Sequence, residues 1–234
     1  MVKAVSLYGY GTIAVTLAAA CSAQGEAKGT VVDSTLAAPI EAVPTEDTRP
    51  IVLFVGTSLT AGFGLDPRQA YPAIVQTKID SAGFDYQVVN AGVSGQTSAG
   101  ARNSIDWLLR RPAAVLVIET GANDGLRGID PAELRSNLEA IVTRAQAQEP
   151  PPAILLVGME APPNLGQRYA SRFRAVYGDV AREHGVRMIP FLLDGVAGID
   201  SLNQADGMHP TAAGQQILAR HVWDVLGPVL AQRP

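Results

Sequence analysis

Short apolar runs alternate with longer segments of helical periodicity from residue 51 to the end of the chain. The runs are enriched in β-branched residues, a pattern typical of strands in a parallel sheet. Five such runs occur, at residues 51–55, 87–90, 114–118, 153–157 and 186–189. These runs predict five buried parallel strands.

The segments between and after these strands carry apolar residues at the spacing of one helix face. The three clearest stripes are Leu134, Leu138, Ile141, Val142 and Ala145; Phe173, Val176, Tyr177 and Val180; and Leu218, Val222, Val225 and Val229. Asp130, Pro131 and Glu133 favour a helix start by supplying a cap, a first-turn proline and a carboxylate. This alternation predicts a doubly wound, three-layer α/β/α domain over residues 51–234, built on a five-stranded parallel sheet.

Residues with catalytic chemistry follow four of the five strands. Ser58 follows the first strand, Gly95 the second and Asn123 the third. Asp206 and His209 follow the fifth. Open parallel sheets bind their ligands along the edge where the strands' carboxyl ends meet, so we expect these residues to share one crevice.

Ser58, His209 and Asp206 are the side chains that a serine hydrolase requires. We expect Ser58 to act as nucleophile and His209 as general base and then general acid, with Asp206 fixing the imidazole tautomer. Pro210 disfavours a helical conformation at His209, which places this histidine on a loop before the last helix. Taken singly, the serine could instead cap a helix and the Asp-x-x-His segment could be a surface turn.

Two glycine-containing loops, around Gly95 and Asn123, are suited to close approach of a ligand. Glycine lets backbone N–H groups point at a ligand, and Asn123 adds an amide donor. Each loop is also explained by a tight turn after a strand, where Gly and Asn are favoured for backbone reasons. We expect His184 to lie at the end of a helix and His221 to lie within the last helix. No second His or Cys stands at metal-ligand spacing to His209, so we expect no metal and no cofactor.

Taken in order, the Gly-Thr-Ser58-Leu, Gly95, Gly-x-Asn123-Asp and Asp206-x-x-His209 blocks resemble those of the SGNH (GDSL-type) hydrolases. The resemblance runs over residues 51–230 and is strongest to the branch of arylesterases and multifunctional acyl-CoA thioesterase/lysophospholipases. It implies a flavodoxin-like SGNH fold and ester hydrolysis through an acyl-serine intermediate. It also implies an oxyanion hole formed by the Ser58 and Gly95 backbone N–H groups and the Asn123 side chain. Thr57 departs from the family, which usually has Asp there.

The resemblance implies a small ester or lipid as substrate, and the sequence does not decide between these classes. Leu126, Ala161 and Leu165 lie in loops after the third and fourth strands and are candidates for the pocket wall. A shallow pocket favours short acyl or aryl esters, whereas an apolar groove admits long-chain thioesters and lysophospholipids. A carbohydrate O-deacetylase on the same fold and a non-catalytic envelope binding module are the alternatives.

The amino-terminal region has the pattern of an export signal. Residues 1–21 combine one positive charge, an apolar stretch too short to span a bilayer, and Cys21. Leu17 to Cys21 resembles a lipoprotein cleavage box, which predicts membrane anchoring through a lipidated Cys21. Ordinary signal cleavage near residues 18–23 is the alternative. Residues 22–50 are rich in Ala, Glu, Thr and Pro and predict a disordered tether. We therefore expect a periplasmic or membrane-anchored protein.

The charge of the chain restricts its partners. The formal net charge is -4, and no cluster of Lys and Arg stands out in the sequence. Nucleic acid is therefore not an expected partner. The sequence does not indicate an oligomeric state.

Overall fold

The computed structural model describes residues 47–233. The proposed signal segment, Cys21 and almost all of the proposed tether therefore lie outside the described residues. Within them, five parallel strands form one sheet in the order β2-β1-β3-β4-β5. The strands are β1 (Ile51–Gly56), β2 (Gln87–Gly92), β3 (Ala113–Glu119), β4 (Ala153–Val157) and β5 (Arg187–Ile189). The predicted five-stranded parallel sheet is confirmed.

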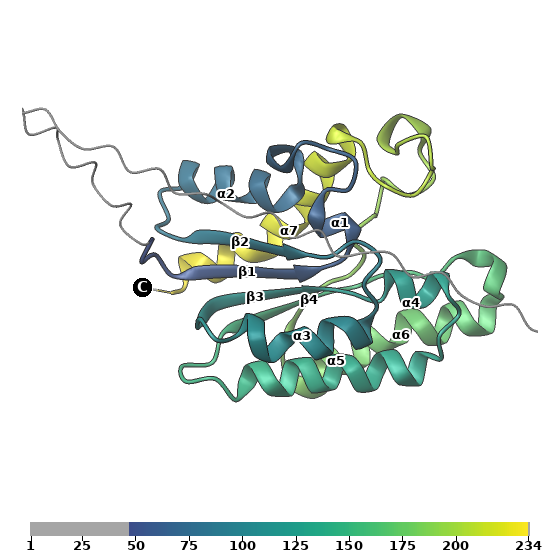
Figure 1. The fold of residues 1–234 in the computed structure, drawn as a ribbon, viewed down its shortest axis with the longest axis horizontal. Helices are drawn as coiled ribbons and strands as arrows, with labels where there is room; N and C mark the ends of the chain where they lie inside the picture. The colour runs from purple at the N-terminus through teal and green to yellow at the C-terminus, as the bar shows by residue number, and fades with distance from the viewer. Residues whose placement is uncertain (1–46, 234) are drawn as a thin grey trace, which may run out of the picture. The chain divides into compact units, whose positions relative to one another are not determined.

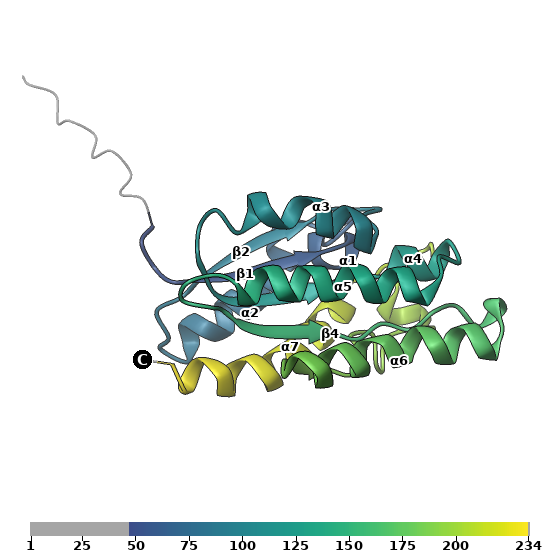
Figure 2. The same ribbon diagram turned by 90° about the horizontal axis from the view of Figure 1, so that it is seen from below.

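Helices cover both faces of this sheet (Figures 1 and 2). Helices α2 (Tyr71–Ser81) and α7 (Ala212–Ala231) lie on one face. Helices α3 (Ser98–Leu108), α5 (Pro131–Gln146) and α6 (Gln167–His184) lie on the other. Two short helices, α1 (Ser58–Ala61) and α4 (Ala122–Leu126), follow β1 and β3 directly. The predicted three-layer α/β/α architecture is confirmed.

The remaining connections contain three short 3₁₀ turns. They are η1 (Pro67–Gln69), η2 (Pro163–Leu165) and η3 (Asp200–Leu202). The chain passes from β1 to the edge strand β2, then crosses back over β1 to β3 and continues to β4 and β5. Strand order reverses at β1, so the crevice beyond the carboxyl ends of β1 and β3 is where a ligand site is expected.

The core lies between the central strands and the apolar stripes of the helices. Phe54 of β1, Leu116 of β3 and Leu155 of β4 are fully buried. The predicted stripes of α5 and α6 are buried throughout, because each faces the sheet. In α7, Leu218, Val222 and Val229 of the predicted stripe are buried, and Val225 is only partly buried.

The expectation that all five strands are buried is wrong for β2. Its residues are half-buried and Asn90 is exposed, since β2 pairs only with β1 and forms one edge of the sheet. Strand β5 forms the other edge and begins with an exposed Arg187. The run of β2 contains only two adjacent apolar residues, Val88 and Val89, between Gln87 and Asn90, which fits a strand that is covered less completely than the central ones.

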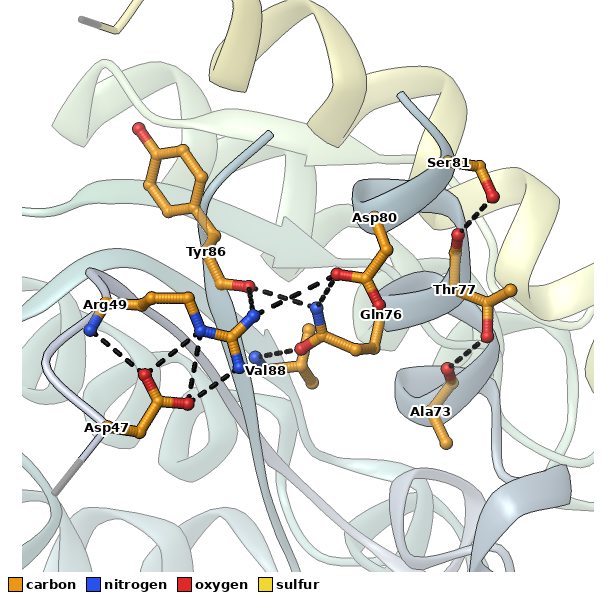
Figure 3. A network of polar contacts seen from close by, with 9 residues as sticks. All are labelled: Asp47, Arg49, Ala73, Gln76, Thr77, Asp80, Ser81, Tyr86 and Val88. Atoms are coloured by element: carbon orange, nitrogen blue, oxygen red, sulfur yellow. Dashed lines mark hydrogen bonds and ion pairs between the residues drawn. The ribbon is translucent and has the colours of Figure 1, made fainter. Parts of the chain in front are cut away.

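The segment that leads into β1 is held by a network of polar contacts (Figure 3). The Arg49 guanidinium donates to the Asp47 carboxylate and to the Tyr86 carbonyl. The Gln76 amide of α2 donates to the same carbonyl at 3.0 Å and accepts from the Val88 N–H at 2.6 Å. Contacts with the domain therefore begin before β1, within the last residues of the segment assigned to the tether.

Candidate active site

The loop between β1 and α1 presents Ser58. Thr57 is the N-cap of α1, and its hydroxyl oxygen accepts from the Leu59 N–H at 3.4 Å. Ser58 is the first residue of the helix, so it is not the capping residue. Gly56 has to be glycine, because a Cβ there would lie 1.9 Å from the Thr60 hydroxyl oxygen. The local structure therefore leaves the Ser58 hydroxyl available for chemistry.

Ser58, His209 and Asp206 form a continuous hydrogen-bonded chain. The Ser58 hydroxyl lies 2.9 Å from His209 Nε2, and His209 Nδ1 lies 2.6 Å from Asp206 Oδ2. The other carboxylate oxygen of Asp206 accepts from the His209 and Met208 backbone N–H groups at 3.0 and 2.9 Å. An ionised carboxylate only accepts hydrogen bonds, so Nδ1 carries the proton and Nε2 accepts from the serine.

The surroundings of Asp206 keep it ionised. The backbone N–H of His209, the imidazole of His209 and the backbone N–H of Met208 hold the pKa of this carboxyl well below its usual range. Hydrogen bonds donated to the charged form stabilise it relative to the neutral acid. Asp206 is therefore suited to orient the ring and to stabilise an imidazolium.

Hydrogen bonds connect the loop that carries His209 to the turn that follows α1. The backbone N–H of Gln204 donates to the His209 carbonyl at 2.7 Å, and its side-chain amide donates to the Phe63 carbonyl at 2.7 Å. The Phe63 ring lies against the imidazole, with ring centroids 4.5 Å apart. As the sequence predicts, His209 lies on a loop that ends where α7 begins at Ala212. Gln204 and Phe63 were not predicted, because their contacts depend on two loops about 140 residues apart.

The candidate oxyanion donors lie beside the hydrogen-bonded residues Ser58, His209 and Asp206. Gly95 has a φ of 78°, a conformation that favours glycine. One hydrogen of the Asn123 amide points to the Gln96 carbonyl at 3.0 Å, which leaves the second for a ligand. Ser58, Gly95 and Asn123 all line one cavity. The structure thus brings together the three groups that the resemblance implies as oxyanion donors.

Asp124 connects the two oxyanion loops, a role that the sequence did not reveal. This buried carboxylate accepts from the Ser98 N–H at 2.8 Å and from the Ser98 hydroxyl at 2.5 Å. The Asn137 amide donates to the same hydroxyl at 3.0 Å. Ser98 begins α3, directly after the Gly95 loop, and Asp124 follows Asn123 in α4. Their hydrogen bonds therefore fix the spacing between Gly95 and Asn123.

Glu119 is a second acidic residue that sequence reasoning missed. It ends β3, is fully buried and faces the Ser58 loop, where the Thr57 and Thr60 hydroxyls and the Thr57 N–H donate to it. Burial raises the pKa of this carboxyl to about 7, although these hydrogen bonds act in the opposite direction. A charged residue at the end of an apolar strand was the available signal. Its partners could be identified only after β1 and β3 were known to be neighbours.

A cavity of about 560 Å³ opens over these residues. Its wall is mostly apolar and includes Leu59, Phe63, Leu126, Met159, Ala161, Phe191, Leu193, Ala197 and Met208. Two of the three predicted wall residues, Leu126 and Ala161, line it. Leu165 does not, because the 3₁₀ turn η2 directs its side chain toward Gly128.

The other histidines have structural surroundings. His184 ends α6 before Gly185, and His221 Nδ1 lies 2.9 Å from the Leu192 carbonyl oxygen. Within residues 47–233, no group of three His, Cys, Asp or Glu side chains is placed to hold a metal ion. None of the helices in this part of the chain is both long and apolar enough to cross a membrane.

Comparisons with known proteins identify the family. Residues 54–217 match the model of the GDSL-like lipase/acylhydrolase family. The chain is 44% identical to esterase TesA of Pseudomonas aeruginosa over 180 residues, which are 76% of this chain and 89% of that protein. It is 35% identical to thioesterase 1/protease 1/lysophospholipase L1 of Escherichia coli K12, covering 76% of this chain and 84% of that protein.

Solved structures agree with this assignment. The crystal structure of TesA superimposes with a TM-score of 0.73 at 43% identity and covers 76% of this chain and 99% of that one. The matched residues include Ser58, Asn123 and His209, the positions on which the resemblance rests. The chain therefore belongs to the GDSL-like lipase/acylhydrolase family, the SGNH hydrolases that its sequence blocks resemble.

Proposed function

We propose that this protein is a serine esterase that hydrolyses carboxylic esters through an acyl enzyme on Ser58. The observation that carries the proposal is the hydrogen-bonded chain from Asp206 through His209 to Ser58, which ends in a cavity that also contains Gly95 and Asn123. The family membership and the esterase names of the relatives support the same chemistry.

In the acylation step, the Ser58 oxygen attacks the carbonyl carbon of the ester and its proton passes to His209 Nε2. Negative charge develops on the former carbonyl oxygen, where the Ser58 and Gly95 N–H groups and the Asn123 amide stabilise it. The intermediate collapses as the bond from the carbonyl carbon to the alcohol oxygen breaks. His209 then gives its proton to the departing alcohol.

The deacylation step repeats this sequence with water. His209 Nε2 removes a proton from a water molecule as the water oxygen attacks the acyl carbon. The second intermediate collapses, the bond to Ser58 breaks and the serine oxygen recovers its proton from His209. Asp206 remains ionised in both steps and stabilises the imidazolium each time.

The cavity favours substrates with an apolar acyl group. Its volume of about 560 Å³ lies within the range of small-molecule sites, and aliphatic and aromatic side chains form most of its wall. We propose that thioesters and lysophospholipids are substrates as well, because relatives with these names share the fold and this wall is apolar. A carbohydrate deacetylase would require more polar groups around the sugar, so we favour the esterase.

We also propose that the protein is exported and anchored through a lipidated Cys21. The support is the sequence of residues 1–21, which lie outside the described part of the chain. Radiolabelled palmitate should enter the wild-type protein and not the Cys21→Ser variant. Equal labelling of both proteins, or labelling of neither, would contradict the anchor.

The test of the proposed activity is hydrolysis of p-nitrophenyl esters from acetate to long acyl chains. Ser58→Ala should abolish turnover, whereas Ser104→Ala should not, because the Ser104 hydroxyl contacts only carbonyl groups of its own helix α3. Both variants should keep the wild-type circular dichroism spectrum. Equal activity of Ser58→Ala and wild type, or none in the wild type, would contradict the proposal.

A further inference from the structure

The buried carboxylate of Glu119 contacts the loop on either side of Ser58. Glu119 Oε2 accepts from the Thr57 N–H at 2.8 Å and from the Thr57 hydroxyl at 3.0 Å. It also accepts from the Thr60 hydroxyl at 2.8 Å. One carboxylate therefore accepts three hydrogen bonds from Thr57, directly before Ser58, and from Thr60, two residues after it.

When Glu119 is ionised, the hydrogen bonds of this cluster all run toward its carboxylate. The Thr60 hydroxyl lies 2.7 Å from the Tyr71 hydroxyl, and because Thr60 donates its only hydrogen to Glu119, Tyr71 is the donor of this bond. Glu119, Thr60 and Tyr71 are 0% exposed. Water therefore does not compete for these donors. The two hydrogen bonds, from Tyr71 to Thr60 and from Thr60 to Glu119, point in one direction only.

The backbone of the loop passes close to this carboxylate. A Cβ at Gly56 would meet Glu119 Oε2 at 2.8 Å as well as the Thr60 side chain. Thr57 also caps α1, so one side chain both begins the helix and binds Glu119. A displaced Thr57 would therefore move Ser58 with it.

We propose that Glu119 and Thr57 are positioning residues for Ser58: the carboxylate fixes the loop so that the serine oxygen stays within hydrogen-bond distance of His209. This inference rests on the proposed role of Ser58 as nucleophile. Neither residue is among those that line the cavity, so we expect neither to contact the substrate. Small misplacements of reacting groups are costly in catalysis, and errors of about 1 Å reduce rates by up to about 10²-fold. The presence of threonine where the family usually has aspartate gives the carboxylate a donor in place of a second acid.

The test compares three isosteric or near-isosteric variants in steady-state ester hydrolysis. Thr57→Val removes the hydroxyl and keeps the shape, and we expect kcat to fall by about tenfold to 10²-fold with KM within about twofold. Thr57→Ser keeps the hydroxyl and should retain kcat within about threefold of wild type. Thr120→Val is the matched control, because the buried Thr120 hydroxyl next to Glu119 has no hydrogen-bond partner among residues 47–233.

A fourth variant separates the cap of α1 from the contact with Glu119. Glu119→Gln leaves the Thr57 cap intact and replaces one accepting oxygen by an N–H₂ group that faces the donors. We expect the same loss in kcat with little change in KM. This variant also keeps the question testable if Thr57→Val does not fold, which thermal unfolding monitored by circular dichroism will show.

The outcomes distinguish this inference from the proposed function. If wild type hydrolyses esters, Ser58→Ala does not, and Thr57→Val and Glu119→Gln both keep wild-type kcat, the positioning role is wrong and the esterase proposal stands. A change confined to KM, or an equal loss in Thr120→Val, would also overturn the positioning role. Absence of activity in the wild type would instead contradict the proposed function.

Discussion

The buried Glu119 should make the stability of this protein depend on pH, and Glu119→Gln should remove that dependence. Glu119 is fully buried at the end of β3, and burial raises the pKa of its carboxyl from 4.5 to about 7. The unfolded chain exposes the group to water, where its pKa returns to the ordinary value. Between these two pKa values, the folded protein holds a proton that the unfolded chain has lost.

The sign and size of the effect follow from this difference in proton binding. Because the folded state binds more protons, the free energy of unfolding decreases as the pH rises from about 4.5 to about 7. Each pKa unit corresponds to about 1.36 kcal/mol, so the rise from 4.5 to about 7 corresponds to about 3 kcal/mol. The contribution of Glu119 is fully present below the unfolded pKa and is lost as the pH passes the folded pKa.

The assay is urea unfolding of wild type and Glu119→Gln across about pH 4 to about pH 8. Glutamine does not titrate, and every other titrating group is common to both proteins and cancels in the difference. We expect the stability of the variant relative to wild type to increase by about 3 kcal/mol across this range. Parallel stability curves would refute the reasoning, because they would mean that Glu119 binds protons equally in the folded and unfolded states.

Three further changes test other parts of the structure. Asn123→Ala should lower kcat by roughly 10²–10³, about 2.7–4 kcal/mol, if its amide is an oxyanion donor; near-normal turnover in ester hydrolysis would reject that role. Asp206→Asn should fold normally, as circular dichroism will show, and lower kcat by about 10⁴ through the wrong histidine tautomer; unchanged turnover would remove Asp206 from the mechanism. Leu155→Ala should destabilise the fully buried centre of β4 by about 2–5 kcal/mol in urea unfolding; a loss below about 1 kcal/mol would contradict the packing of the core.

The sequence determined the elements of the fold and the chemistry of the candidate site. The five apolar runs lie within one or two residues of the observed strands, because a buried strand needs a local apolar run and a helix needs a local stripe. Ser58, Asp206 and His209 were identifiable because each belongs to a short block in a fixed order. Local pattern was sufficient for these features, since each depends on residues close together in the chain.

Strand order and the contacts across loops came only from the tertiary structure. Strand β2 was expected to be buried like the other strands, and it is half-buried because it stands at the edge of the sheet. Leu165 belongs to a plausible pocket loop, but a 3₁₀ turn directs it away from the cavity. Glu119 meets Thr57 across 62 residues of sequence because β1 and β3 are neighbours in the sheet. Periodicity reports only which face of an element is apolar, whereas the pairing of strands decides which side chains from distant segments meet.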